Sequence, residues 1–377
     1  MNVNPTTIRK EISTMNLVKT TYSSDDVIML MQDVKGRVPI LDTAEREKLN
    51  QSGIHYSEML PLEYVPTDEY MNIYNESLKS LSYDTACAVA VLADKIVNRH
   101  GENTVLVSLA RAGTPIGILL KRYIKLKYDF DAPHYSISII RGKGIDVKAM
   151  NIIADRHGSS GIQFIDGWVG KGAINNVLDK ACKQLRQSND KFKDLDSTLA
   201  VLTDPACATD MYGTRQDFLI PSACLNATVT GLVSRTVKLK DMTNDELHGA
   251  VFYEENKDHD VSYDFINTVA QCFDSVNTHH FSPSIAEMDK NFKGIDEVRE
   301  ICKTYNIPDI NKVKPGVGET TRVLLRRVPH IVLINPEADS KYLAHILQLC
   351  KEKNIPTKYH NLKKYNVCGI IKTVADL

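Results

Sequence analysis

Short apolar runs alternate with amphipathic stretches through the middle of the chain. Four runs have the length and composition of buried strands, at residues 104–109, 135–140, 161–165 and 198–202. Stretches with apolar positions near helical spacing lie before and between them, at residues 70–100, 113–123 and 172–187. Strands separated by helices predict a parallel α/β sheet, in which ligands bind where the strands end. We therefore expect the site in the loops after Leu109, Ile140 and Ile165.

A smaller set of elements follows after about residue 290. Residues 286–313 are polar and helical in pattern, with Pro308 and Pro315 as breakers. Next come an apolar strand at 331–334, a helix at 341–353 and a strand from about residue 357. The expected organisation has three parts: an N-terminal extension over residues 1–40, an α/β domain over 41–290 and a small α/β domain over 296–377.

Charge is divided unevenly between these parts. The 377 residues carry a net charge of −1, yet residues 301–377 hold 13 Lys/Arg against 6 Asp/Glu. Such segregation favours an anionic partner for the C-terminal domain. A solvated basic surface has the same composition and is the alternative.

The cysteines and the apolar runs indicate the cellular compartment of the protein. Eight cysteines are scattered without a C-x-x-C pair, which favours a reducing cytoplasm over a disulfide framework or a zinc site. No apolar run approaches the ~18 residues that a membrane span needs. No signal peptide is visible either, so we expect a cytoplasmic protein with no membrane partner.

The segment from Ile162 to Ile174 carries the most informative motif. An apolar strand ends in Asp166, and a glycine-rich turn with Lys171 leads into a helix. Turn amides, the helix dipole and the lysine attract a phosphate, and the carboxylate can accept hydrogen bonds from a vicinal diol. A ribose 5-phosphate offers both groups. A plain strand-to-helix turn with a capping acid is the alternative.

Two further loops favour a phosphate ligand. Arg111 and Gly113 follow the first strand, where a guanidinium can grip a diphosphate and a glycine permits close approach. Arg141 and Lys143 follow the second strand, and the polar stretch from there to Gly161 is expected to be a mobile lid. A helix-opening turn and an exposed basic loop are the simpler interpretations.

Together the three loops resemble those of type I phosphoribosyltransferases, which use phosphoribosyl pyrophosphate (PRPP). The resemblance implies Mg²⁺-dependent transfer of ribose 5-phosphate to an unknown base-like acceptor on a type I phosphoribosyltransferase-like sheet. It places catalysis on Asp166, Arg111, Arg141 and Lys143, and PRPP binding on Ala112, Gly113, Gly167, Gly170, Lys171, Gly172 and Ala173. Gly167 stands where these enzymes have a second acid. The alternative is therefore a catalytically inactive regulator that senses PRPP or a nucleotide and binds RNA.

Residues 203–237 place polar side chains in apolar surroundings after the fourth strand. We expect an acceptor pocket here, formed by Asp204, Asp210, Tyr212, Arg215 and Arg235. An internal ion-pair network that holds the lobe together fits the same residues equally well.

From about residue 20 onward, the chain resembles a phosphoribosyltransferase-like family encoded with tellurium-resistance and stress-response genes. Its members carry a Pelota-like RNA-binding domain at the C-terminus and are proposed to make a nucleoside-like product. Some such chains carry a cysteine-protease label, for which the candidates here are Cys224 or Cys207 with His279 or His280. No general-base spacing accompanies these residues, so a protease is the minor alternative.

The C-terminal domain resembles the Pelota superfamily, whose motif is Gly-x-Asn-Glu-x-x-Lys. Gly316, Glu319 and Arg322 fall on this motif, with Gly318 at the Asn position. The resemblance implies binding of structured RNA through Gly316, Gly318, Glu319, Arg322, Arg326 and Arg327, with residues 362–369 as a second loop facing RNA. A module that packs on the enzyme without binding RNA is the alternative. A homo-oligomer is left open.

Overall fold

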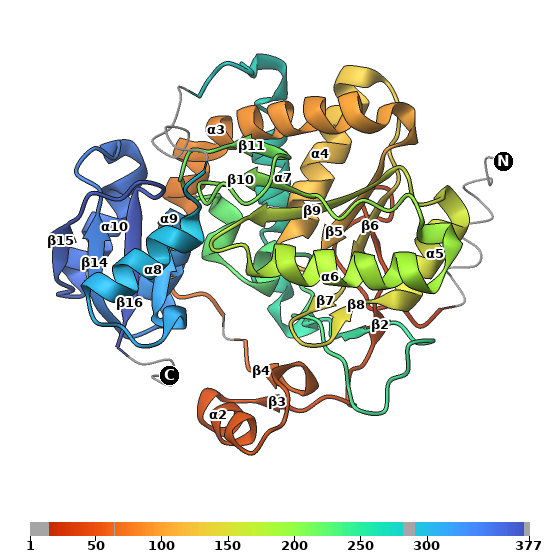
Figure 1. Ribbon diagram of the computed structural model, residues 1–377, viewed down its shortest axis with the longest axis horizontal. Coiled ribbons are helices and arrows are strands. Elements are labelled where there is room, and N and C mark those ends of the chain that lie inside the picture. The colour runs from red at the N-terminus through yellow and green to blue at the C-terminus, as the bar shows by residue number, and fades with distance from the viewer. Residues whose placement is uncertain (1–14, 64, 282–290, 373–377) are drawn as a thin grey trace.

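The computed structural model describes residues 15–63, 65–281 and 291–372 (Figure 1). Its centre is a parallel sheet in the order β1-β6-β5-β9-β10-β11. The six strands are β1 (Ile28–Met29), β5 (Val105–Leu109), β6 (His134–Ile137), β9 (Ile162–Trp168), β10 (Leu199–Thr203) and β11 (Tyr212–Thr214). The predicted mixed α/β architecture with a parallel sheet is confirmed.

Two details differ from the expected strands. β1 lies within residues 1–40, which we expected to be an extension, and it forms the edge of the central sheet. The apolar run at 135–140 is split, because β7 (Ile139–Ile140) leaves the sheet and pairs antiparallel with β8 (Gly144–Ile145). Ser138 marks the break, where its carbonyl accepts a hydrogen bond from the Asp146 amide at 3.0 Å.

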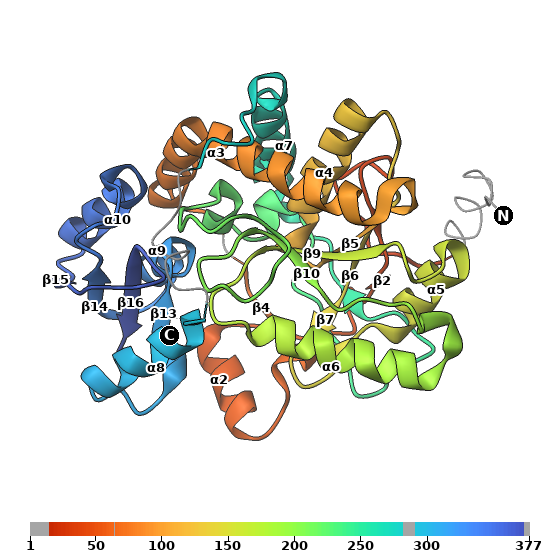
Figure 2. The same ribbon diagram turned by 45° about the horizontal axis from the view of Figure 1, so that its top comes forward.

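Helices cover both faces of the sheet (Figures 1 and 2). One face carries α3 (Asp68–His100), α4 (Gly113–Tyr128) and α7 (Ser262–Ala270), and the other carries α5 (Val147–His157) and α6 (Ala173–Ser188). α3 has acidic residues in its first turn and basic residues in its last, as the helix dipole favours. Its bounds agree with the helical pattern predicted over residues 70–100.

α5 replaces most of the expected lid. Asp146 begins the helix, because its carboxylate accepts a hydrogen bond from the Ala149 amide at 2.9 Å. Met150 and Ile153 on the inner side of the helix are fully buried. The prediction of a mobile lid up to Gly161 is therefore wrong, and the turn between β7 and β8 is all that remains of it.

Small paired elements complete the first domain. β3 (Ile40–Leu41) and β4 (Leu60–Pro61) pair beside α2 (Thr43–Gln51), which projects from the body at the bottom of Figure 1. β2 (Gln32–Asp33) pairs with β12 (Gly249–Ala250). Across the described ranges, no helix has the length and apolar character that crossing a membrane requires.

The C-terminal domain is a second α/β unit. Its sheet has the order β13-β16-β14-β15 and its helices are α8, α9 and α10. Their bounds are β13 (Val313–Pro315), β14 (Pro329–Ile334), β15 (Thr357–Tyr359), β16 (Val367–Ile371), α8 (Gly294–Thr304), α9 (Val317–Arg326) and α10 (Ser340–Glu352). β16 is buried between β13 and β14, so only the first part of the tail expected to face RNA is a loop. The expected division near residue 290 falls beside residues 282–290, which lie outside the described ranges.

The two domains are joined by shared packing. Val317 and Leu324 of α9 belong to the same buried hydrophobic cluster as Leu202 and Phe218 of the first domain. An ion pair also joins the domains, because the Lys341 ammonium of α10 lies 2.6 Å from the almost fully buried Asp84 carboxylate of α3. The C-terminal domain is therefore packed against the carboxyl edge of the central sheet.

Candidate functional site

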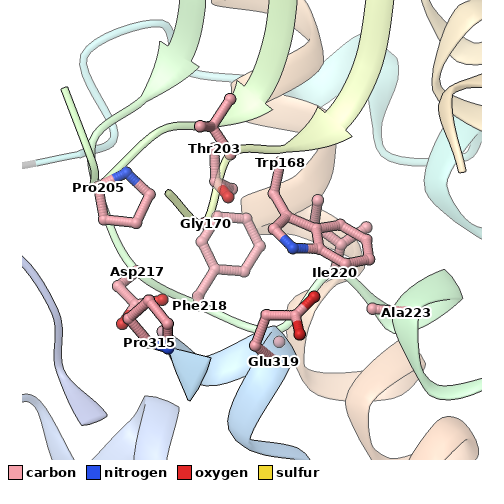
Figure 3. Close-up of a pocket in the computed structure, with 13 residues that line it drawn as sticks. Trp168, Gly170, Thr203, Pro205, Asp217, Phe218, Ile220, Ala223, Pro315 and Glu319 are labelled. Atoms are coloured by element: carbon pink, nitrogen blue, oxygen red, sulfur yellow. The ribbon is translucent and has the colours of Figure 1, made fainter. Parts of the chain in front are cut away.

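Three parallel strands end together at the edge that faces the C-terminal domain. Their register places Ser108 beside Ile165 and Trp168 beside Thr203, so the loops after β5, β9 and β10 leave the sheet at one place. Trp168 from the end of β9 and Glu319 from α9 approach one another across this junction (Figure 3). The predicted location of the site at the strand ends therefore coincides with the junction between the domains.

A cavity of about 310 Å³ lies in this junction, and we call it the interdomain cavity. The first domain contributes Ala112, Arg141, Asp166, Trp168 and residues 169–175, and the second contributes Asn311, Lys314, Pro315, Glu319 and Arg322. An adjoining cavity of about 200 Å³, lined by Arg111, shares Asp166, Trp168 and Arg322 with it. The two cavities together form one hollow along the strand ends.

The predicted phosphate loop lines the interdomain cavity. The structure brings Asp166 together with Ala112, Arg141, Gly170, Lys171, Gly172 and Ala173. The Gly167 amide donates to the Asp166 carboxylate at 2.8 Å, yet burial raises the pKa of this carboxyl to about 7. Gly113 and Gly167 are buried beside the cavity instead of lining it.

Some of the predicted cations already have partners within the protein. The Lys171 ammonium donates to the carbonyls of Ile310 and Val313, both at 2.9 Å, and so ties the loop to the second domain. The Arg111 guanidinium lies 2.6 Å from the Glu63 carboxylate. Both side chains therefore stabilise the fold through contacts within the protein.

Lys143, Arg141 and Lys314 are less closely paired than Lys171 and Arg111. Lys143 lies 3.8 Å from Glu58 and lines neither cavity. Within the described ranges, no hydrogen bond or ion pair reaches the Arg141 guanidinium or the Lys314 ammonium. The interdomain cavity is therefore lined by four cationic side chains against two carboxyl groups.

The polar segment after β10 forms an internal network. Asp204 is fully buried, forms an ion pair with Arg215 and accepts the amides of Ala208 and Thr209 at 2.8 and 2.9 Å. The Arg215 guanidinium also lies 3.7 Å from the centre of the Tyr212 ring. None of the predicted acceptor residues, Asp204, Asp210, Tyr212, Arg215 and Arg235, lines the interdomain cavity or the adjoining one. The network instead holds the loop at residues 204–209.

This loop carries Cys207 in an unusual conformation. Its backbone φ is +53°, in the left-handed region that few non-glycine residues adopt. The Cys207 sulfur lies 3.5 Å from the Lys364 ammonium of the second domain. Cys207 as a residue is 3% exposed. Cys207 thus combines backbone strain with a basic partner, a combination found at functional sites.

The other cysteine and histidine candidates are not brought together. Cys224 lies 4.0 Å from the hydroxyl of Ser77, inside the core beneath α3. His280 lies 2.7 Å from the carboxylate of Asp84, two helical turns from Ser77 along the same helix, or roughly 10 Å. His279 is exposed. The structure therefore forms a histidine–aspartate pair beside α3, two helical turns from the Ser77 hydroxyl that the Cys224 thiol contacts.

The motif expected to face RNA lies at the junction with the first domain. Asp217 accepts hydrogen bonds from the amides of Val317 and Asn366, each at 2.8 Å, and so occupies the N-terminus of α9. Gly316 has φ +88°, and a Cβ at this position would lie 3.1 Å from the Asp217 carboxylate. Gly318 lies next to Trp168. The motif glycines thus serve the contact between domains in this structure.

The charged residues of the RNA motif are distributed differently. Glu319 and Arg322 line the interdomain cavity and lie 3.8 Å apart. Arg327 is exposed, and the side chain of Arg326 lies outside the described residues. Contact of these residues with RNA stays a prediction.

Sequence reasoning missed Trp168, Asp217, Lys314 and Lys364 as parts of this site. Trp168 carried a usable signal, because it is the only tryptophan and follows Asp166 by two positions at a strand end. The partners of Asp217 and Lys364 are 100 or more residues away along the chain, so no local pattern reveals them. In the described residues, no group of three or more His, Cys, Asp or Glu is placed to hold a metal ion.

Comparisons with known proteins define the class of this α/β chain. Residues 20–270 match the family model described as "Tellurite-like stress resistance cysteine protease StiP", and residues 292–373 match the PELOTA RNA-binding domain model. The chain belongs to the StiP family. A relative named "Cysteine protease StiP", from Acinetobacter baylyi, is 34% identical over 346 residues, which cover 88% of each chain.

These comparisons overturn the predicted activity. Both the family and the relative are named as cysteine proteases, so the predicted phosphoribosyltransferase, with PRPP and Mg²⁺ in nucleoside synthesis, is wrong. The cysteine protease, which the sequence offers only as the minor alternative, is the activity in the family name. The predicted stress association and the Pelota-like domain are supported. The comparisons name no residues, so roles of individual side chains stay predictions.

Proposed function

We propose that the chain is a thiol-dependent peptide hydrolase, with Cys207 as its nucleophile, that acts in the tellurite-like stress response for which its family is named. The contact between the Cys207 sulfur and the Lys364 ammonium carries this proposal. A cysteine nucleophile needs a neighbouring group that favours the thiolate or moves its proton. Cys207 also lies on a loop at the carboxyl edge of the sheet, where α/β proteins place their sites.

The chemistry requires only these two side chains and water. The thiolate attacks the scissile carbonyl carbon, and the C–N bond breaks as Lys364 supplies a proton to the departing amine. Water then hydrolyses the thioester, which releases the acid and restores the thiol. Lysine has this role beside serine nucleophiles in other hydrolases, so a histidine is not required.

Access to the thiol depends on the second domain. Cys207 is buried, and its sulfur contacts Lys364 on the loop at residues 361–366. A peptide can reach the sulfur only when this loop moves aside, as lids do in many enzymes. Hydrolysis is therefore expected to depend on motion between the two domains.

Substitution of the candidate cysteines tests the proposal. We expect Cys207→Ala to abolish hydrolysis of an unstructured protein substrate. Cys224→Ala is the matched control and should keep this activity, because its thiol faces Ser77 in the core. Lys364→Gln should shift the pH profile of the remaining activity. Wild-type turnover by Cys207→Ala would contradict the assignment.

For residues 292–373, we propose binding of structured RNA, supported by the PELOTA domain match and the surplus of Lys and Arg. Affinity is expected to fall steeply with salt, because phosphate contacts release counterions. Arg327→Ala should lower the slope against log salt by about one unit. Filter binding with kinked, duplex and single-stranded RNA measures this. Absence of binding to all three at low salt would contradict the proposal.

For the first domain, the strand arrangement supports a finer likeness to type I phosphoribosyltransferases. This likeness concerns fold alone. Because one fold hosts many chemistries, it carries no activity.

A further inference from the structure

The N-terminus of α9 cannot serve RNA while the domains are docked. Its Val317 amide already donates to Asp217, which also accepts the Asn366 amide. Asp217 is buried there, beside Gly316. A phosphate cannot occupy the same amides as this carboxylate. RNA that binds the docked chain must therefore contact groups other than these amides.

The cations that remain near α9 face the interdomain cavity. Lys314 and Arg322 come from the second domain, and Arg141 comes from the first. Burial and the neighbouring Arg327, Arg141 and Arg322 all lower the pKa of Lys314, and Glu319 only partly opposes them. An anion in the cavity would relieve this repulsion.

Trp168 gives the cavity a surface for an aromatic ring. Its indole is half-buried at the end of β9, and the Arg322 guanidinium lies 5.9 Å from the ring centre. Proteins that hold single strands combine such stacking surfaces with cations that follow the phosphates. A cavity of about 310 Å³ is large enough for one small ligand.

We propose that a single-stranded segment of the bound RNA enters the interdomain cavity, with one base stacked on Trp168 and its phosphate between Arg141, Lys314 and Arg322. The inference rests on the proposed RNA binding of residues 292–373 and adds the first domain to the binding surface. Stacking accepts every base, so little base preference is expected at this position. RNA thus bridges the two domains.

The single tryptophan makes the proposal directly measurable. The full-length chain is titrated with an RNA hairpin that carries a short single-stranded tail, and with the same hairpin cut blunt. We expect the tailed hairpin to quench tryptophan fluorescence and to bind more tightly, by roughly 5- to 150-fold if one base stacks. The blunt hairpin should bind without quenching.

Two variants locate the contact. Arg141 is exposed, and its guanidinium forms no hydrogen bond or ion pair with the described residues, so Arg141→Ala, which keeps the backbone hydrogen bond to Tyr56, should fold normally. We expect it to lower the salt slope for the tailed hairpin by about one unit. Arg99→Ala is the matched control, because it removes an exposed arginine at the opposite edge of the sheet. Trp168→Phe should keep most of the affinity through its remaining ring.

The outcomes separate this inference from the proposed RNA binding. Equal affinities for tailed and blunt hairpins, without quenching, overturn the cavity assignment and leave RNA binding in place. Failure of both hairpins to bind overturns both proposals. Quenching by a free nucleoside monophosphate with the affinity of the tailed hairpin overturns the RNA assignment, because the cavity would then be a site for free nucleotides.

Discussion

Arg215→Ala is expected to lower the free energy of unfolding by about 3–5 kcal/mol. The substitution leaves the fully buried carboxylate of Asp204 without its ion-pair partner. Burial raises the pKa of Asp204, and the positive charge of Arg215 is the first influence that opposes this shift. The substitution therefore leaves a buried carboxylate with backbone amides alone as partners, and it also removes the stacking of the guanidinium on Tyr212.

Urea denaturation of matched variants measures this effect. Arg99→Ala removes an ion pair to Asp196 in which both side chains are more than one-third exposed, so it should cost at most about 1 kcal/mol. Adding Asp204→Asn to Arg215→Ala should restore part of the loss, since the uncompensated charge disappears. If Arg215→Ala were no more destabilising than Arg99→Ala, the network would not hold the Cys207 loop as we describe.

A second large loss is expected for Gly113→Ala, about 3 kcal/mol, at the upper end of the range for overpacking. A Cβ at this position would be pressed against the carbonyl of Ile165 and would lie 3.2 Å from the Cα of Asp166. Both contacts are with backbone, which cannot rotate away. α4 would have to move off β9, and thermal denaturation would show a lower midpoint.

Gly167→Ala is the control for Gly113→Ala. The nearest atom to a Cβ at Gly167 lies 3.7 Å away, which is an ordinary contact distance. Both glycines belong to loops that we expected to bind PRPP, and only one of them is required by packing. Equal midpoints for the two variants would show that α4 does not depend on this close approach.

The central sheet was predictable because its strands are buried on both faces. The runs at 104–109 and 198–202 are mostly apolar, and every residue of the strands β5 and β10 within them is buried. The sequence also contains the pattern of α5, since Val147, Met150 and Ala154 follow the capping Asp146 at helical spacing. Its charged and polar positions suggested a lid instead, although only Asp155 of the helix is exposed.

The site was predictable in position but not in chemistry. Parallel strands bring their loops to one edge, so Asp166 and Arg141 meet as expected. The roles of Lys171 and Cys207 depend on Ile310, Val313 and Lys364, which fold against them from the other domain. Loop motifs shared with one enzyme class did not define the activity, because one α/β architecture hosts many reactions.

The Asp217 carboxylate occupies backbone amides that could otherwise bind a phosphate. A fragment cut near residue 290 would lack the carboxylate that fills the amide nest at Val317 and Asn366. Such a nest of backbone amides is a general anion site. The excised domain would therefore hold RNA through a surface that the intact chain keeps closed. Affinities measured on the fragment would describe a different binder from the parent protein.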